Sequence, residues 1–317
     1  MSRFHKAFLQ TPLNGTTRFA GFGKHPAWDD HIDDIGLATQ SLVLAKQSLY
    51  SEGIAGQLAS GAWDQIERSH QTIEFAHRFV WSRAQQSIVG AIWASADRKG
   101  RTRFPMVVCV QADRGGPAAT HTFLVAIERL SSVCKAAQTQ EDVRNAFDRA
   151  REEINDQIFL STTFSRSEPG TQIPEDKILP ALVTLSAGLK SHRNRGSKNA
   201  ARSKCFRLPT ASDQMMENLE FWAMYVAKQL NPDWPYLIIV PVAKSWIDLI
   251  VGEPISNDFY CLRADETALP MATVEIEAAR TRKLEAEARD YLQMLASGAI
   301  AIRQIRSSWW SRLLGRF

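Results

Sequence analysis

The 317-residue sequence has only four cysteines, and no two of them form a CxxC pair. The N-terminus also lacks the charged and then apolar pattern of a secretory signal. Widely spaced cysteines without such a signal favour reduced thiols over a disulfide framework. The sequence therefore predicts a cytoplasmic protein. The cysteines are Cys109, Cys134, Cys205 and Cys261.

Long apolar runs and convincing internal repeats are absent as well. The longest apolar runs, such as residues 237–242, fall far short of the roughly 20 residues that a membrane-spanning helix needs. We therefore expect no transmembrane helix. The composition, 44% hydrophobic and 23% charged, is typical of a globular chain with a sizeable core, in one large domain or two ordinary ones.

The common sequence motifs of catalysis and phosphate binding are also missing. There is no GxSxG elbow, and none of the cysteines has a histidine beside it in sequence. The run Gly21-Phe22-Gly23-Lys24 lacks the GxxxxGK[ST] spacing of a phosphate loop, so we interpret it as a turn that requires small residues. Cys109, inside an apolar run, is interpreted as a core residue.

Histidine and aspartate do gather between residues 25 and 34, where they could bind a transition metal. No HExxH spacing places two imidazoles on one helical face. We favour helix capping and surface acidity for the aspartates, with a metal site and an interaction surface as the alternatives. The cluster comprises His25, Asp29, Asp30, His31, Asp33 and Asp34.

Positive charge is concentrated in two segments. Residues 190–207 carry seven Lys or Arg and no acid, and residues 300–317 carry four Arg and no acid. Subtracting these eleven charges from the net charge of +4 leaves −7 for the rest of the chain. We expect 190–207 to be a solvated, mobile loop, with an acidic protein partner or nucleic acid as alternatives. Nucleic acid is disfavoured because Phe206 is the only Phe, Tyr or Trp in this segment that could stack on a base.

The C-terminal residues 300–317 combine four arginines with apolar positions that include Trp309 and Trp310. Wound as a helix, this tail would be basic and amphipathic. We favour packing back on the body of the protein. Docking into a partner's groove and peripheral contact with an anionic membrane are the open alternatives.

Apolar periodicity predicts an α/β fold with a mixed sheet covered by helices, followed by a second, helix-hairpin-helix α+β part. Residues 104–111 read as a central strand buried on both faces, and residues 235–242 and 245–251 as a hairpin. The expected organisation is an α/β domain at 1–160, a connector with the basic mobile loop at 161–211, a helix-hairpin-helix part at 212–298 that completes the fold or forms a smaller domain, and the basic tail at 299–317.

Two segments together resemble the TagF family of type VI secretion-associated proteins. Gly21-Phe22-Gly23-Lys24-His25-Pro26, followed by Asp29-Asp30, is similar to the family's G-(F/Y)-G-K-x-P segment. Residues 94–105, ASADRKGRTRFP, resemble its (P/A)-S-x-D-x-x-G-R-x-(F/Y)-P segment. The resemblance covers residues 17–160 and continues loosely through 212–263. The chain departs from the family in having Asp29-Asp30 where a GD pair is usual, and one extra residue between Arg101 and Phe104.

The resemblance implies a regulator that restrains the secretion machine after translation by engaging a forkhead-associated-domain component. It implies no enzymatic activity, cofactor or small-molecule substrate. One alternative is a structural or adaptor component of a contractile secretion or injection apparatus. A metal-dependent hydrolase that uses His25, Asp29, Asp30 and His31 is the third hypothesis.

We interpret the two motifs first as determinants of the fold. An Asp29 or Asp30 carboxylate could pair with Arg101 or Arg103 if the two segments meet, and we expect a charged ridge there, at one end of the sheet. The expected structural residues are Gly21, Gly23, Lys24, Pro26, Asp97, Gly100, Phe104 and Pro105. The expected partner-binding residues are Asp29, Asp30, Arg98, Arg101, Arg103, Trp309 and Trp310.

Overall fold

The computed structural model describes residues 17–69, 72–83, 86–112, 117–160, 173–194, 203–230, 234–273 and 278–296. The chain forms two compact units. The larger one comprises Met1–Ile173 with Ser197–Met271, and the smaller one Pro174–Gly196 with Ala272–Phe317. No helix in the described residues is both long and apolar enough to span a bilayer.

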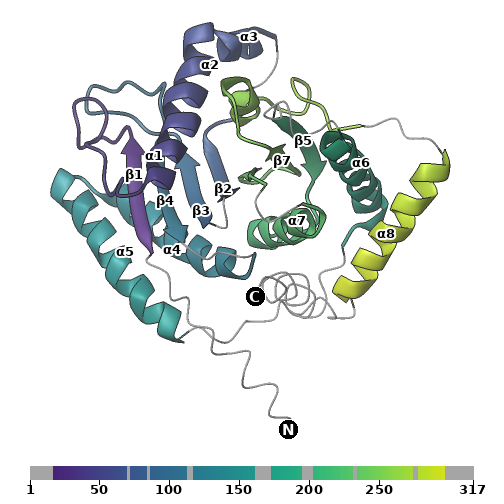
Figure 1. Ribbon diagram of the computed structural model, residues 1–317. Coiled ribbons are helices and arrows are strands. Elements are labelled where there is room, and N and C mark those ends of the chain that lie inside the picture. The colour runs from purple at the N-terminus through teal and green to yellow at the C-terminus, as the bar shows by residue number, and fades with distance from the viewer. Residues whose placement is uncertain are drawn as a thin grey trace. The chain divides into compact units, whose positions relative to one another are not determined.

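The larger unit is built on a seven-stranded sheet with the strand order β1-β4-β3-β2-β6-β7-β5 (Figure 1). The predicted α/β class is confirmed. In place of the mixed directions that we expected, all six strand pairings are antiparallel. The strands are β1 (Arg18–Gly23), β2 (Ala76–Arg83), β3 (Gln86–Trp93), β4 (Met106–Ala112), β5 (Lys204–Pro209), β6 (Tyr236–Pro241) and β7 (Trp246–Val251).

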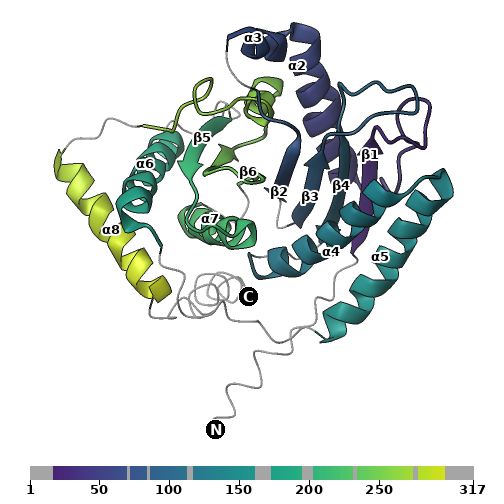
Figure 2. The same cartoon turned by 180° about the vertical axis from the view of Figure 1, so that it is seen from behind.

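Helices cover both faces of this sheet (Figures 1 and 2). On one face, α4 contacts β3 and β4, α5 contacts β1, and α7 contacts β6. On the other, a helix that runs through α1, the π-helical η1 and α2 shares one apolar core with α3 and the 3-10 segment η2. Double coverage explains why β4 is apolar at nearly every position although its neighbours are antiparallel. The helices are α1 (Gln40–Ala45), η1 (Lys46–Ile54), α2 (Ala55–Ser60), α3 (Ala62–Ser69), α4 (Pro117–Ala136), α5 (Gln140–Leu160), α7 (Met215–Gln229) and η2 (Ser256–Leu262).

The two halves of the sequence share this one sheet. The predicted hairpin is confirmed as β6 and β7. Strand β2 joins it to the first half, because His77 is paired with Ile92 of β3 on one side and with Pro241 of β6 on the other. The hairpin therefore extends the first sheet.

The segment expected to be a connector, 161–211, contains a helix and an edge strand. Helix α6 (Glu175–Asn194) begins just after Pro174, whose carbonyl accepts hydrogen bonds from the first turn, and it includes Pro180. Pro174 thus precedes a helix start, whereas Pro180 lies inside the helix. Strand β5 then occupies the end of the basic run.

The smaller unit pairs α6 with α8 (Ala278–Ala296), which lies within the predicted helix-hairpin-helix part at 212–298. Two ion pairs join the helices. Lys190 Nζ lies 2.9 Å from Glu287 Oε2, and Arg289 Nη1 lies 2.9 Å from Glu175 Oε1. Their side chains are exposed or half-buried, so each pair adds at most about 1 kcal/mol.

Candidate binding surface

The two segments that resemble the family meet at one end of the sheet. Lys24 follows β1, and its backbone N–H donates to the carbonyl of Pro105, which immediately precedes β4. Its Nζ lies 2.5 Å from Asp97 Oδ2, and both side chains are almost entirely buried. A buried charge is stable only when it is paired and hydrogen-bonded. Lys24 and Asp97 therefore tie the two segments together.

Asp97 also shapes the turn that follows it. Its Oδ1 accepts the backbone N–H groups of Lys99 and Arg101, each at 3.0 Å, and its Oδ2 accepts Arg101 Nε at 2.6 Å. Gly100 completes the turn with φ +76° and donates its N–H to the Asp97 carbonyl. Burial acts to raise the pKa of Asp97, but the hydrogen bonds from Lys24 and Arg101 outweigh it and hold this pKa well below its usual value.

Above this buried anchor, opposite charges from the two segments are paired at the surface. Arg101 Nη2 lies 3.1 Å from Asp30 Oδ1 and donates to the Asp29 carbonyl at 2.8 Å. Arg98 Nη1 lies 3.3 Å from Asp29 Oδ1, and Arg98 Nη2 donates to the Ala27 carbonyl at 2.7 Å. The four charged side chains are 49–65% exposed. We call Asp29, Asp30, Arg98 and Arg101 the charged ridge.

The expected contact between the segments is thus confirmed, with Arg101 as the pairing arginine. Arg103 does not reach the aspartates of the first segment. It pairs with Asp64 of α3 at 3.3 Å, and both side chains are more than half exposed. Phe104 turns inward, and its ring packs against His31 and Tyr50.

The glycines of the first segment are required by two close approaches. A Cβ on Gly21 would lie 2.4 Å from the ring of Phe147, so this glycine lets α5 pack directly on β1. Gly23 has φ +115°, and a Cβ there would lie 2.3 Å from the Pro105 carbonyl oxygen. The predicted need for small residues is confirmed, but Gly21–Gly23 end strand β1 and the turn follows them, so the predicted position of the turn is wrong. Pro26 is exposed in the turn that follows Lys24.

The two histidines of the cluster, His25 and His31, lie in different surroundings. His25 is buried: its Nε2 donates to the Cys134 carbonyl at 2.8 Å, and its Nδ1 accepts the Ala27 N–H at 3.1 Å. Burial lowers the pKa of His25. His31 is exposed beside Asp30. Within the described ranges, no three or more His, Cys, Asp or Glu side chains cluster closely enough to hold a metal ion.

Two other aspartates of this cluster are surface acids rather than helix caps. Asp33 accepts Arg144 Nη2 at 2.9 Å, and Asp34 pairs with Lys46 at 2.5 Å. The helix begins at Gln40, beyond these aspartates, and its cap is Thr39, whose hydroxyl accepts the Leu42 N–H. Gly36, whose φ is +67°, lies between these aspartates and the helix.

The end of the basic segment is buried rather than solvated. Arg207 on β5 makes a bidentate pair with Asp248 on β7, at 2.8 and 2.9 Å. It also donates to the carbonyls of Asp265 and Leu269, so all three donor nitrogens are used. An aspartate inside the apolar run of β7 was the sequence signal for this pair. We missed it because the partner lies 41 residues away.

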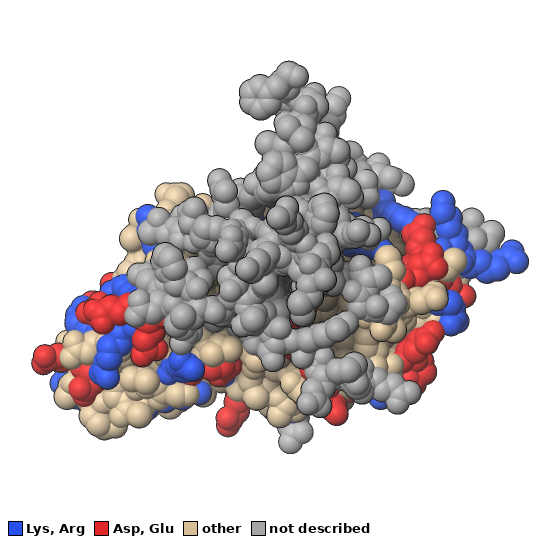
Figure 3. Space-filling model, turned by 90° about the horizontal axis from the view of Figure 1, so that it is seen from below, with Lys and Arg blue, Asp and Glu red and all other residues tan. Residues whose placement is uncertain are grey.

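Two of the expected contact features lie outside the described residues. One is the C-terminal tail at 299–317 with Trp309 and Trp310, and the other is the middle of the basic segment, residues 195–202. On the face shown in Figure 3, the described acidic and basic side chains are interleaved rather than separated by sign.

A scan of protein-family models finds none that matches this chain, and a search of curated proteins finds no match either. Among solved structures, the chain is similar to the crystal structure of PA0076 from Pseudomonas aeruginosa PAO1. The TM-score is 0.40 and the identity 12%, over 82% of this chain and 97% of that one. At this level the likeness carries no information about function.

Proposed function

We propose that this protein is a non-enzymatic regulator that resembles the post-translational repressors of type VI secretion and acts by binding a forkhead-associated-domain protein or another assembly component. One observation carries the proposal. The two segments that resemble the family form a single unit, in which the buried Lys24 and Asp97 fix a turn and present the charged ridge at the surface.

The geometry of the ridge suits recognition of another protein. Its side chains are exposed, yet hydrogen bonds to backbone carbonyls hold Arg98 and Arg101 in place. Arginine has five donors in a rigid fork, so each can bind a partner's carboxylate while it keeps its own contacts. Charges fixed before binding lose little conformational entropy when the partner docks. Alternating signs favour a partner with a complementary pattern.

The test should use residues that border the ridge without holding the turn together. Arg101 is unsuitable, because it also binds the buried Asp97. Lys99 is exposed at the tip of the turn, and Arg103 makes only a surface pair. The double variant Lys99→Glu, Arg103→Glu should fold normally and bind a purified forkhead-associated-domain component of the secretion system at least about tenfold more weakly, measured by calorimetry.

The matched control is the double variant Arg282→Glu, Lys283→Glu, an equivalent reversal of two exposed charges on α8 of the smaller unit, which should bind as the unchanged protein does. Equal affinity of the double variant and the control would contradict the use of this surface. Binding of purified sheath or baseplate proteins, with none to the forkhead-associated-domain component, would favour the structural or adaptor role instead.

A further inference from the structure

The loop that carries the charged ridge also presents a threonine, Thr102, to solvent. Thr102 is exposed and lies between Arg101 of the ridge and Arg103, outside any helix or strand. Neither its hydroxyl nor its backbone N–H and C=O groups make a hydrogen bond with any residue that the structure describes. The hydroxyl is therefore open to an enzyme that approaches the ridge.

Other exposed threonines are engaged by acidic neighbours. Thr139 Oγ1 donates to Asp142 Oδ2 at 2.7 Å, and Thr267 Oγ1 donates to Asp265 Oδ1 at 2.7 Å. These hydroxyls are held in place, and the charge beside them is negative. Thr102 differs from both, because its hydroxyl is not engaged and its neighbours in the chain are cations.

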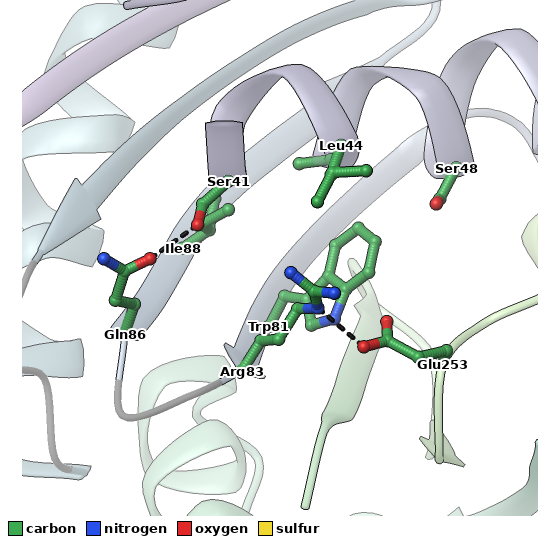
Figure 4. Close-up of a pocket in the computed structure, with 9 residues that line it drawn as sticks. Ser41, Leu44, Ser48, Trp81, Arg83, Gln86, Ile88 and Glu253 are labelled. Carbon is green, nitrogen blue, oxygen red and sulfur yellow. Dashed lines mark hydrogen bonds and ion pairs between the residues drawn. The ribbon is translucent and has the colours of Figure 1, made fainter. Parts of the chain in front are cut away.

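The opposite end of strand β3 from the ridge offers a second contrast. A shallow pocket lies there, between α1 and the β2–β3 hairpin (Figure 4). Ser41 Oγ donates to Gln86 Oε1 at 2.5 Å, and Arg83 Nε donates to Glu253 Oε1 at 2.6 Å. This hydroxyl and this cation are both engaged, in contrast to those around Thr102.

Two cations beside Thr102 are available to a partner that recognises positive charge. Lys99, three residues before it, is exposed, and its ammonium has no acidic partner among the described residues. Arg103, the next residue, pairs only with Asp64 at 3.3 Å, and both side chains are more than half exposed. Surface pairs of this kind contribute little and open readily. Protein kinases select their substrates partly through such charge patterns.

The arginines of the ridge are already occupied. Arg101 binds Asp97 and Asp30, and Arg98 pairs with Asp29. A phosphothreonine carries about −1.5 to −2 charges at pH 7 and three acceptor oxygens. Because carboxylates already hold these two arginines, most of the hydrogen-bonding capacity of a phosphate in this loop stays open to another protein.

We infer that Thr102 is a phosphorylation site for a serine/threonine kinase that selects basic substrates, and that its phosphothreonine is the group that a forkhead-associated domain binds at the ridge. Such domains recognise phosphorylated motifs through arginine clusters. The inference rests on the proposed function, because it names the chemical group that the proposed partner recognises.

The modification is a phosphoryl transfer from ATP. A bond forms between Thr102 Oγ1 and the γ-phosphorus, and the bond between that phosphorus and the β–γ bridging oxygen breaks. The hydroxyl proton passes to the catalytic aspartate of the kinase, and ADP leaves.

Mass spectrometry of the phosphorylated full-length protein tests the site itself. The probe is the catalytic domain of protein kinase C, a kinase that selects basic substrates, with Mg²⁺ and ATP. We expect phosphate on Thr102 and none on Thr267. The rate at Thr102 should fall at least about tenfold in the double variant Lys99→Glu, Arg103→Glu. Absence of phosphate on Thr102, or an unchanged rate in this variant, would overturn the inference.

The matched charge control is again Arg282→Glu, Lys283→Glu on α8, which should be phosphorylated at Thr102 as fast as the unchanged protein. An equal loss of rate in this control would show that the kinase responds to the overall charge of the protein and would overturn the role of the two cations beside Thr102.

Calorimetry then compares the phosphorylated and unmodified proteins as ligands of the purified forkhead-associated-domain component. Phosphate on Thr102 should tighten binding at least about tenfold, because hydrogen bonds between arginine and phosphate are charge-assisted. Thr102→Val has the same shape without the hydroxyl, and its site is exposed, so it should fold normally. After the same kinase treatment, this variant should bind as the unmodified protein does.

Phosphate on Thr102 with unchanged or weaker affinity would overturn the inference. Equal tightening in the treated Thr102→Val would do the same, because the gain would then come from another residue. The proposed function is judged separately, by the binding of the unmodified protein and its loss in Lys99→Glu, Arg103→Glu. It stands if that loss is seen and phosphate changes nothing, and both fail if neither form binds.

Discussion

Lys24 and Asp97, 73 residues apart in the chain, form a buried ion pair with 2.5 Å between Nζ and Oδ2. The pair joins the turn after β1 to the loop before β4, and the exposed ridge is built on top of it. Removing one partner of a buried pair leaves the other charge buried and unpaired, which costs more than the pair contributes when intact. The stability of this region should therefore respond to single substitutions more strongly than to double ones.

Lys24→Met should destabilise the protein toward the lower end of the roughly 3–5 kcal/mol seen when a buried pair is broken, because Arg101 still binds Asp97. Denaturant unfolding measures this loss. Lys99→Met removes an exposed lysine from the same loop and serves as the control, with an expected change within about 0.5 kcal/mol. Equal stability of the two variants would show that Lys24 is not an anchor.

Two glycines with positive φ should respond differently to alanine. Gly100→Ala should cost about 1–2 kcal/mol, because φ is +76° but no atom lies within 4 Å of the added Cβ. Gly23→Ala should cost about 3 kcal/mol or more, because its Cβ also collides with the Pro105 carbonyl. Thermal unfolding of both variants gives the comparison, and similar losses would contradict the close approach.

The buried pair of Arg207 and Asp248 should behave as a unit. Arg207→Met alone should cost about 3–5 kcal/mol, because it leaves a buried carboxylate without its cation. The double variant Arg207→Met, Asp248→Leu should recover a large part of this loss, since it removes both charges together. Urea unfolding of the two single variants and the double variant measures the coupling. Additive losses would show that the two side chains do not depend on each other.

Acid should destabilise the fold through His77. Burial, together with the positive charges of Arg78, Arg207 and Arg263, lowers the pKa of His77 to about 3. The unfolded chain, with an ordinary pKa near 6.5, then binds the proton more readily. Stability should fall as the pH drops below about 6.5, by up to about 1.4 kcal/mol per pH unit for this group, and this loss should level off near pH 3.

Substitution of His77 by Gln should make this pH dependence shallower. The slope of unfolding free energy against pH, measured by urea unfolding between pH 7 and pH 5, should decrease by about 1 kcal/mol per unit. Part of the slope should remain, because His25 also has a lowered pKa. An unaltered slope in His77→Gln would contradict the buried, neutral histidine.

Local signals in the sequence were sufficient for most of the elements. The apolar run of β4 and the β6–β7 hairpin could both be predicted, because strand periodicity depends on neighbouring residues. The need for small residues at Gly21 and Gly23 could be predicted from the glycines themselves, but their close contacts with Phe147 and Pro105 could not.

The sequence by itself also brought the two segments of the site together as a hypothesis, through opposite charges at Asp30 and Arg101. Only the tertiary structure decided the rest. Asp30 pairs with Arg101 and not with Arg103. Lys24 and Asp97 form a buried ion pair. His25 is buried away from the acidic residues, and its ring donates a hydrogen bond to the Cys134 carbonyl. These outcomes depend on which residues meet across the sheet and across the helix layer. Contacts between residues tens of positions apart leave no periodicity in the chain, so they had to come from the packed structure.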